Sequence, residues 1–247
     1  MTLEEFFTQH PRTAVAFSGG TDSAMVLWAA GRYGRDVRAY YVHTVFQPAF
    51  ELADAKRLAE ELDVPLTVVE ADVLAVPEAA ANGPRRCYYC KKALFTTLWQ
   101  RAREDGYTVL LDGTNASDDA GDRPGMQALR ELEVRSPLRE CGITKAEVRR
   151  MSKEAGLFTW DKPAYACLAT RVPTGTAITR KALEKVERGE NALFRLGFSD
   201  FRVRLLGDAA RIQVPADQME RALALRGEIN QALEADFSAV LLDLAGR

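Results

Sequence analysis

The chain has 247 residues, 47% of them hydrophobic, so it can bury a substantial core in one large domain or two smaller ones. Its 33 basic and 35 acidic side chains give a net charge of −2, which excludes a general attraction to nucleic acid and favours a small-molecule substrate. No apolar run is long enough to cross a membrane, and residues 1–7 lack the order of a signal peptide. We therefore expect a cytoplasmic protein that binds neither membrane nor nucleic acid.

Strand-like and helix-like stretches alternate along the first half of the chain. After a short helix over residues 4–10, the β-branched and apolar residues 13–17 suit a buried parallel strand, and apolar residues then recur at helical spacing over 24–30. The further expected elements are strand 37–42, helix 51–62, strand 66–69, loop 75–84, helix 91–104 and strand 108–111. This alternation predicts an α/β fold with a parallel sheet covered on both faces.

The loop between the first strand and its helix has the sequence Ser-Gly-Gly-Thr-Asp-Ser. Its glycines let the backbone approach a ligand closely, and the free amides of the following helix turn attract an anion. Asp22 can cap this helix or help to hold a divalent cation such as Mg²⁺ beside phosphates. The alternative is a turn that only joins strand to helix. The candidate phosphate site consists of Ser18, Gly19, Gly20, Thr21, Asp22 and Ser23.

This loop lacks the spacing of the Walker loop and of the dinucleotide fingerprint. It resembles the pyrophosphatase loop, or PP-loop, of enzymes that cleave ATP between the α and β phosphates and adenylylate an acceptor. The Asp-Gly-Thr-Asn sequence that follows strand 108–111 lies at the carboxyl edge of the sheet, where ligands bind in open α/β folds. We therefore assign to the ATP site Asp112, Gly113, Thr114 and Asn115, together with Arg123 from the polar loop that follows.

The pattern changes in the second half of the chain. Residues 144–155 predict a helix with Thr144 as its cap and Glu147 in the capping-box position. The irregular stretch 160–171 is rich in reactive side chains and should border the active site. Beyond it we expect helix 180–196, strands 201–206 and 211–214, helix 218–223 and strand 239–242. The hairpin character of this tail predicts a smaller α+β domain.

The four cysteines are expected to be ligands, nucleophiles or buried small side chains rather than disulfides. Cys87 and Cys90, directly before helix 91–104, form a Cys-x-x-Cys pair that suits a metal or a redox disulfide. Two cysteines without a close histidine leave a zinc site incomplete, and Cys167 could be a third ligand. Cys141 is expected to be a packed side chain.

Nearly the whole chain resembles the LarE-type sulfur transferases, a PP-loop family that helps to build the nickel-pincer nucleotide cofactor. The likeness rests on residues 18–23, 87–92, 112–115, 123–125, 135–138, 160–163, 166–169 and 202–204. It implies a HUP-like, Rossmann-like PP-loop domain over 1–165 and a C-terminal domain over 166–247 for substrate binding, sulfur transfer and oligomerisation. It also implies a homo-oligomer.

In that family, ATP adenylylates a carboxylate of a pyridinium mononucleotide, and a sulfur held by the protein then displaces AMP. The resemblance makes Cys167 the sulfur-bearing residue, with Arg171 beside it as a further catalytic residue. In the sacrificial version, Cys167 loses its own sulfur and becomes dehydroalanine. In three-cysteine members, Cys87, Cys90 and Cys167 would hold a [4Fe-4S] cluster with an extra sulfide. The in vivo sulfur donor is not implied, and both mechanisms stay open.

Arg202 and Arg204 are two residues apart on one strand, so both point to the same face and could bind the substrate phosphate. The alternative is two solvated side chains. Glu187 and Glu190 could hold a cation, or could form a solvated face. The chain departs from the family pattern at Thr170, Thr174 and Leu205 with Leu206. The alternatives are a transfer-RNA thiolase, an amide-forming ligase, or a protein that only binds nucleotide or stores sulfur.

Overall fold

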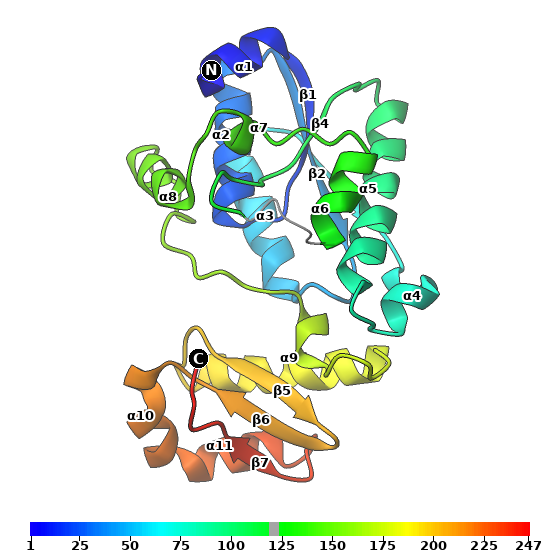
Figure 1. The fold of residues 1–247 in the computed structure, drawn as a ribbon. Helices are drawn as coiled ribbons and strands as arrows, with labels where there is room; N and C mark the ends of the chain where they lie inside the picture. Colours follow the sequence, from blue (N-terminus) through cyan, green and yellow to red (C-terminus); the bar gives the residue numbers. More distant parts are fainter. Residues whose placement is uncertain (119–123) are drawn as a thin grey trace.

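The first half of the chain folds around a parallel sheet, as Figure 1 shows for the computed structural model, which describes residues 1–118 and 124–247. In their order across the sheet, the strands are β3 (Leu66–Glu70), β2 (Asp36–His43), β1 (Arg12–Ala16) and β4 (Leu110–Leu111). On β1, Ala14 pairs with Arg38 of β2 and Leu110 of β4, and all pairings are parallel. The predicted α/β fold is confirmed.

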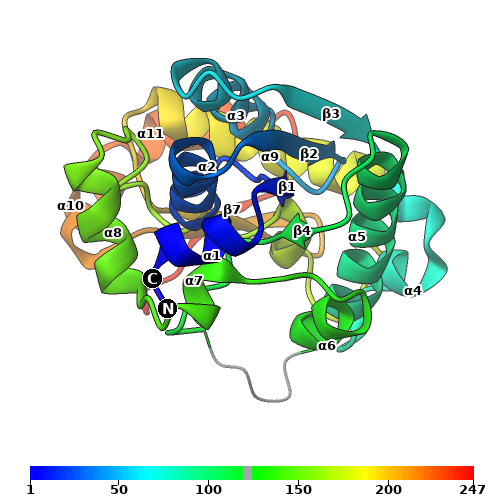
Figure 2. The same ribbon diagram turned by 90° about the horizontal axis from the view of Figure 1, so that it is seen from above.

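Helices cover both faces of this sheet (Figures 1 and 2). Successive strand residues point to opposite faces, so Val15 packs into one core and Ala14 into the other. The core of Val15 is closed by α1 (Leu3–Gln9), α2 (Thr21–Tyr33), α3 (Ala49–Glu61), α7 (Pro137–Glu140) and α8 (Lys145–Glu154). The core of Ala14 is closed by α5 (Arg86–Glu104), beside which α6 (Pro124–Glu131) lies. α2 is buried on nearly all sides because it lies between other helices and the sheet.

Two stretches in the first half of the chain differ from the sequence prediction. α5 begins at Arg86, so Cys87 and Cys90 lie inside its first two turns rather than before it, which corrects the expected start at residue 91. The expected loop 75–84 contains the end of a 3₁₀ turn, η1 (Val73–Ala75), and a short helix, α4 (Pro77–Ala80). Proline suits the first turn of a helix because its missing N–H would have no partner there.

The C-terminal part is a second, smaller sheet with its own helices. β5 and β6 form the predicted antiparallel hairpin, and β7 adds to β6 in parallel. Gly207, with φ of +57°, makes the turn between the hairpin strands. The elements are η2 (Leu168–Arg171), α9 (Arg180–Arg195), β5 (Arg202–Leu206), β6 (Ala209–Gln213), η3 (Ala216–Gln218), α10 (Met219–Ala224), α11 (Arg226–Leu233) and β7 (Val240–Leu242).

This second sheet has a separate hydrophobic core around Val203 and Ile212, which supports our proposal that residues 166–247 form a domain of their own. A further cluster, centred on Phe46, Leu168 and Val186, joins the two parts. We call it the bridging core. Among the described residues, no helix has the length and apolar character that a membrane crossing requires.

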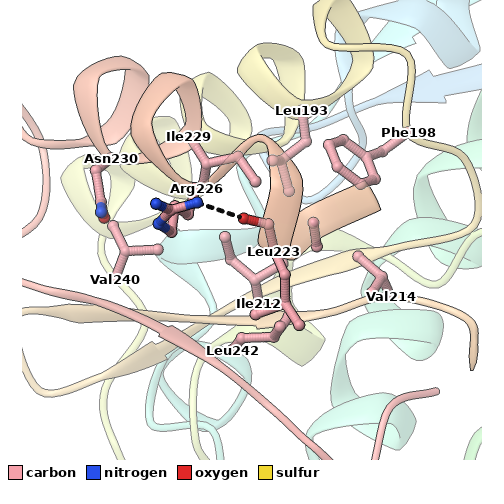
Figure 3. A pocket seen from close by; sticks show the side chains of 11 residues that line it. Leu193, Phe198, Ile212, Val214, Leu223, Arg226, Ile229, Asn230, Val240 and Leu242 are labelled. Atoms are coloured by element: carbon pink, nitrogen blue, oxygen red, sulfur yellow. Dashed lines mark hydrogen bonds between the residues drawn. The ribbon is translucent and has the colours of Figure 1, made fainter. Parts of the chain in front are cut away.

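A small cavity of about 90 Å³ remains inside the C-terminal core (Figure 3). Its walls are mostly apolar, and Arg226 closes one side by donating from Nη1 to the carbonyl oxygen of Leu223 over 3.3 Å. The cavity is therefore a packing space between β6, β7 and the two short helices.

Asn82 ties the stretch that follows η2 to the start of α5. Its Nδ2 donates to the carbonyl oxygens of Val172 (3.3 Å), Pro173 (2.9 Å) and Thr176 (3.1 Å). Its Oδ1 accepts from Nη1 of Arg86 at 2.7 Å. Asn82 is 1% exposed and has φ of +56°, a conformation that asparagine tolerates better than most residues.

We expect Asn82→Ala to lower the free energy of unfolding by about 2 kcal/mol or more, because buried hydrogen-bonding groups lose their partner and alanine disfavours positive φ. Urea unfolding measures the change. The control is Asn191→Ala, which removes an exposed side chain from α9. Equal midpoints for the two variants would contradict this role of Asn82.

Candidate active site

The loop between β1 and α2 folds tightly against the start of α2. The amide of Ser18 donates to Oγ of Ser23 over 3.2 Å, and the Ser23 hydroxyl donates to the carbonyl oxygen of Gly20 over 3.1 Å. Gly19 has φ of +72°, and a Cβ there would lie 3.1 Å from the carbonyl oxygen of Glu51. Among the described residues, no side chain caps the N-terminus of α2. Its first amides are therefore available to bind an anion.

Asp22 connects this loop to two distant segments. Its Oδ2 lies 2.6 Å from Nζ of Lys145, and its Oδ1 accepts from Nδ2 of Asn115 over 3.3 Å. The hydroxyl of Thr21 donates to the carbonyl oxygen of Thr159 over 2.8 Å. Lys145 is the first residue of α8, so the capping box at Thr144 brings a positive charge to the phosphate loop.

The Asp-Gly-Thr-Asn segment after β4 lies directly against the loop. A Cβ on Gly113 would approach the amide nitrogen of Ser23 to 2.7 Å, so only glycine fits this contact. The carboxylate of Asp112 accepts from the amide and hydroxyl of Thr114 and from Oγ of Ser136 at 2.6 Å. Asp112 thereby fixes the shape of the segment that approaches α2.

A second lysine reaches the loop from the irregular stretch before the C-terminal part. Nζ of Lys162 donates to the carbonyl oxygen of Gly19 over 3.2 Å and lies 2.6 Å from Oδ2 of Asp54. Arg149 holds the backbone there by donating to the carbonyl oxygens of Trp160 and Lys162. The phosphate loop thus lies between two lysine ammonium groups.

Two cavities adjoin these groups. One of about 110 Å³ lies beside the loop and is lined by Ala16, Phe17, Ser18, Tyr40, Val42, Gln47, Leu94, Phe95 and Leu98. A larger one of about 490 Å³ extends from Lys162 to Arg202 between aromatic side chains that include Phe50 and Tyr165. The start of α5 leads to the first cavity, because Cys90 is one helical turn before Leu94.

Burial and neighbouring thiols raise the pKa of Cys90 and of Cys167. Burial, and then the nearby Cys167 and Cys87, raise the pKa of Cys90 to about 12, although Arg86 and Lys91 oppose the rise. Burial also raises the pKa of Cys167, while Arg86 lowers it and Cys87 raises it. Cys141 lies elsewhere, against the core below α1 and α7, and burial raises the pKa of its thiol. Cys90 and Cys167 both pack against the bridging core, and Cys87 lies about one helical turn before Cys90 in α5.

None of the four cysteines, all of which belong to the described residues, forms a disulfide. Within the described ranges, no three histidine, cysteine or acidic side chains are placed to hold a single metal ion. A [4Fe-4S] cluster makes a different demand, because each thiolate binds a separate iron. Cysteine thiolates are the donors that such a cluster binds, and the assignment of Cys87, Cys90 and Cys167 to three of its irons stays a prediction.

Arg86 lies between these thiols and the C-terminal part. Its Nη1 donates to the carbonyl oxygen of Ala169 over 3.0 Å as well as to Asn82, and its Nη2 lies 3.7 Å from Sγ of Cys87. Arg86 thus places a positive charge beside Cys87 and fixes η2 against α5.

Arg202 and Arg204 project to the same side of β5, as predicted, and both contact the stretch around Cys167. Nη2 of Arg202 donates to the carbonyl oxygen of Ala164 over 2.9 Å, and Nη1 of Arg204 donates to that of Thr170 over 2.6 Å. Burial, and then the charge of Arg171, lowers the pKa of both guanidinium groups. Such crowded positive charges favour the approach of an anion.

The comparisons with known proteins agree with each other. A family model described as asparagine synthase matches residues 8–157. An uncharacterised protein of Synechocystis is 39% identical over 99% of this chain and 92% of its own length. The pyridinium-3,5-bisthiocarboxylic acid mononucleotide synthase of Lactiplantibacillus plantarum is 36% identical over 95% of this chain and 86% of its own. A tRNA-specific 2-thiouridylase of Clostridium botulinum is 24% identical over 71% of this chain and 60% of its own.

The chain belongs to the LarE family. The resemblance found in the sequence is thereby confirmed, and the protein is an ATP-dependent sulfurtransferase with a PP-loop domain. Its assignment to the three-cysteine type stays a prediction.

In this LarE-family chain, the predicted ATP-site residues lie together at the N-terminus of α2, apart from Arg123, which lies outside the described residues. Their roles in binding stay predictions. The expectation of a cation site or a solvated face at Glu187 and Glu190 is wrong in its geometry. Glu190 is 2% exposed and pairs with Arg171, whereas Glu187 accepts from the amide of Ala49. Arg171, Tyr165 and the amide of Val203 together donate four hydrogen bonds to Glu190, so its carboxylate has no acceptor position left for a cation.

The sequence prediction did not assign a role to Lys145, Lys162 or Arg86. Lys162 lies within a segment already matched to the LarE family, so its Lys-Pro sequence was a usable signal. Lys145 is an ordinary helix-start residue in the sequence, and Arg86 lies before the predicted helix 91–104. Only the folded chain brings Lys145 to the loop and Arg86 to the thiols.

We expect Gly113→Ala to weaken ATP binding by about tenfold or more, because a Cβ there would collide with the backbone of Ser23 at the phosphate loop. Titration of the nucleotide analogue AMPPNP measures the affinity. The matched control is Gly83→Ala, since a Cβ at Gly83 meets no atom within 4 Å among the described residues. Equal affinities in both variants would contradict the placement of the phosphates.

Proposed function

We propose that this chain uses ATP to activate a carboxylate of a pyridinium mononucleotide and then replaces AMP with sulfur to form a thiocarboxylate. The observation that supports it most directly is the placement of Asp22, between Asn115 and Lys145, at an uncapped helix N-terminus. The relative from Lactiplantibacillus plantarum, 36% identical over 95% of this chain, is named as a synthase of such a mononucleotide. The nickel-pincer cofactor would be the destination of the product.

In the first step, a carboxylate oxygen of the substrate attacks the α phosphorus of ATP, and the bond to the bridging oxygen of the β phosphate breaks. Pyrophosphate leaves with both electrons of that bond. The first amides of α2 and the hydroxyls of Ser18 and Ser23 would bind the phosphates, and Asp22 would help to hold Mg²⁺ there. Lys145 is close enough to Asp22 to stabilise the charge of the departing pyrophosphate.

The substrate would lie between this loop and β5. The cavity of about 490 Å³ that extends from Lys162 to Arg202 offers room there for a ligand group. We propose that Arg202 and Arg204 bind the phosphate of the mononucleotide, in keeping with the lowered pKa that burial and Arg171 give both.

In the second step, sulfur attacks the activated acyl carbon, and AMP leaves with the electrons of the C–O bond. In the sacrificial version, the thiolate of Cys167 forms the new bond, the proton on its Cα is removed, and the Cβ–S bond breaks to leave dehydroalanine. Burial raises the pKa of Cys167, so its free thiol is protonated at neutral pH and needs a positive partner to ionise. Arg86 is the first of the charges that lower this pKa.

The alternative sulfur source is a [4Fe-4S] cluster held by Cys87, Cys90 and Cys167. When bound, such a cluster would supply sulfide from its fourth iron, so that Cys167 is not consumed. The chain itself contributes Cys90 and Cys167 against one apolar cluster, Cys87 on the preceding helical turn, and the contact of Arg86 with Cys87. We propose this version because the sacrificial reaction uses Cys167 alone and gives no role to the Cys-x-x-Cys pair of Cys87 and Cys90.

We expect wild-type protein mixed with ATP and pyridinium-3,5-dicarboxylate mononucleotide to release pyrophosphate and form a thiocarboxylate. Asp22→Ala should lower the rate of pyrophosphate release by about 10²-fold to 10³-fold, because a preorganised charge at the phosphates is lost. The control is Asp217→Ala, at an exposed position outside the site. Turnover with transfer RNA instead of the mononucleotide would assign the chain to the thiouridylase activity, and equal rates in both variants would remove Asp22 from the reaction.

We expect protein prepared without oxygen to contain iron and sulfide, and to lose both in Cys87→Ser, Cys90→Ser and Cys167→Ser because each thiolate binds one iron. Cys141→Ser, in the separate core, is the matched control and should keep them. Iron analysis and the visible absorption spectrum measure the outcome. If the wild type holds no iron and Cys167 loses the mass of hydrogen sulfide after one turnover, the sacrificial mechanism is correct instead.

A further inference from the structure

Arginine side chains hold the backbone on both sides of Cys167. Nη1 of Arg171 donates to the carbonyl oxygen of Ala166 over 2.8 Å and to that of Cys167 over 3.4 Å. Arg202 and Arg204 hold the carbonyl oxygens of Ala164 and Thr170, which begin and end the same stretch. Because guanidinium groups are planar and have several donors, these contacts fix both the position and the direction of the stretch.

A single carboxylate organises this arrangement. Oε1 of Glu190 lies 2.7 Å from Nε of Arg171 and Oε2 lies 3.2 Å from its Nη2, a two-point pairing. Glu190 also accepts from the hydroxyl of Tyr165 and, over 3.1 Å, from the amide of Val203. The side chains of Arg171 and Glu190 are 0% and 2% exposed. The four hydrogen bonds to Glu190 thus come from Tyr165 before Cys167, from Arg171 after it, and from Val203 in β5.

We propose that Glu190 is a positioning residue for sulfur transfer, which fixes Cys167 relative to the strand of Arg202 and Arg204. The proposal rests on the proposed function. Through Arg171, Glu190 orients the carbonyl groups at Ala166 and Cys167; through the amide of Val203, it fixes the start of β5. Glu190 would thereby fix the distance and orientation of the sulfur relative to the bound substrate phosphate.

The charge of Glu190 matters here, beyond its shape. Arg171, Arg202 and Arg204 are crowded together, and Glu190 is the carboxylate that Arg171 pairs with. Without that charge, Arg171 would be an uncompensated buried cation among like charges and would move away from the carbonyl oxygens that it holds. An error of about 1 Å in the placement of a reacting group can cost about 10²-fold in rate.

Glu190→Gln keeps the size of the side chain and removes its charge. In a single turnover with protein in excess, we expect pyrophosphate release within about twofold of wild type, because the phosphate loop is untouched. Thiocarboxylate formed per AMP should fall by about tenfold or more, because water then discharges the adenylate before misplaced sulfur reaches it. The matched control is Glu184→Gln, at an exposed position of the same helix.

A residue that only stabilised the fold would lower pyrophosphate release and thiocarboxylate formation together, and that result, or an unchanged ratio of thiocarboxylate to AMP, would overturn the proposal. Arg171→Met with Glu190→Gln removes both buried charges and keeps the test valid if the single variant does not fold. The double variant should show the same loss in the ratio, because the contacts to Ala166 and Cys167 are absent from it.

A second measurement does not depend on the substrate. We expect the rate at which iodoacetamide alkylates Cys167 in iron-free protein to change by about fivefold or more in Glu190→Gln, with the rate at Cys141 unchanged. A parallel rise at Cys141 would indicate general unfolding, and an unchanged rate at Cys167 would overturn the proposal. If wild-type protein releases no pyrophosphate, the proposed function fails, while the alkylation result still decides the positioning role.

Discussion

The uncapped N-terminus of α2 is the constraint on which the rest of the site depends. Its amides can meet an anion only if other segments approach closely without a side chain between them. Because it has no side chain, Gly19 can lie against the backbone of Glu51, and Gly113 can lie against the backbone of Ser23. The contacts join the starts of α2 and α3 with the end of β4, which are distant in the sequence. The site at the N-terminus of α2 therefore forms only when the parallel sheet and its crossover connections are complete.

The two kinds of positive side chain have different tasks in this molecule. Lys145 and Lys162 bring compact charges to the phosphate loop, where a ligand with changing charge is expected. Arg86 and Arg171 use their planar groups to hold carbonyl oxygens next to the thiols. Separate sets of cations thus contact the phosphate loop and the backbone around Cys167.

The sequence was sufficient for the fold class because the strands of a parallel sheet are buried and the helices between them are periodic. The capping box at Thr144 and the hairpin of strands 201–206 and 211–214 were also predicted, since both depend on local residues alone. The start of α5 was missed because tertiary packing extends that helix through Cys87 and Cys90. α11 was missed because its apolar pattern is weak and its burial depends on the second sheet.

The candidate site divides in the same way. The phosphate loop and Asp112 to Asn115 follow from strand ends and glycine spacing, which are visible in the sequence. The partners of Arg171 and Asp22 do not, because Glu190 and Lys145 are separated from them along the chain and meet them only through packing of complete elements. The sequence alone does not distinguish a buried glutamate from an exposed one. Glu190 becomes the ion-pair partner of Arg171 because the folded chain buries it.

The bridging core has a consequence for cooperativity. It combines Phe46 from the segment after β2, Leu168 next to the predicted sulfur donor Cys167, and Val186 from α9. Apolar surface shared in this way makes the free energy of each part depend on the other, so the two sheets should melt as one thermodynamic unit. Leu168 lies at the junction. Any fluctuation large enough to release the stretch around Cys167 therefore also loosens the coupling between the two halves of the molecule.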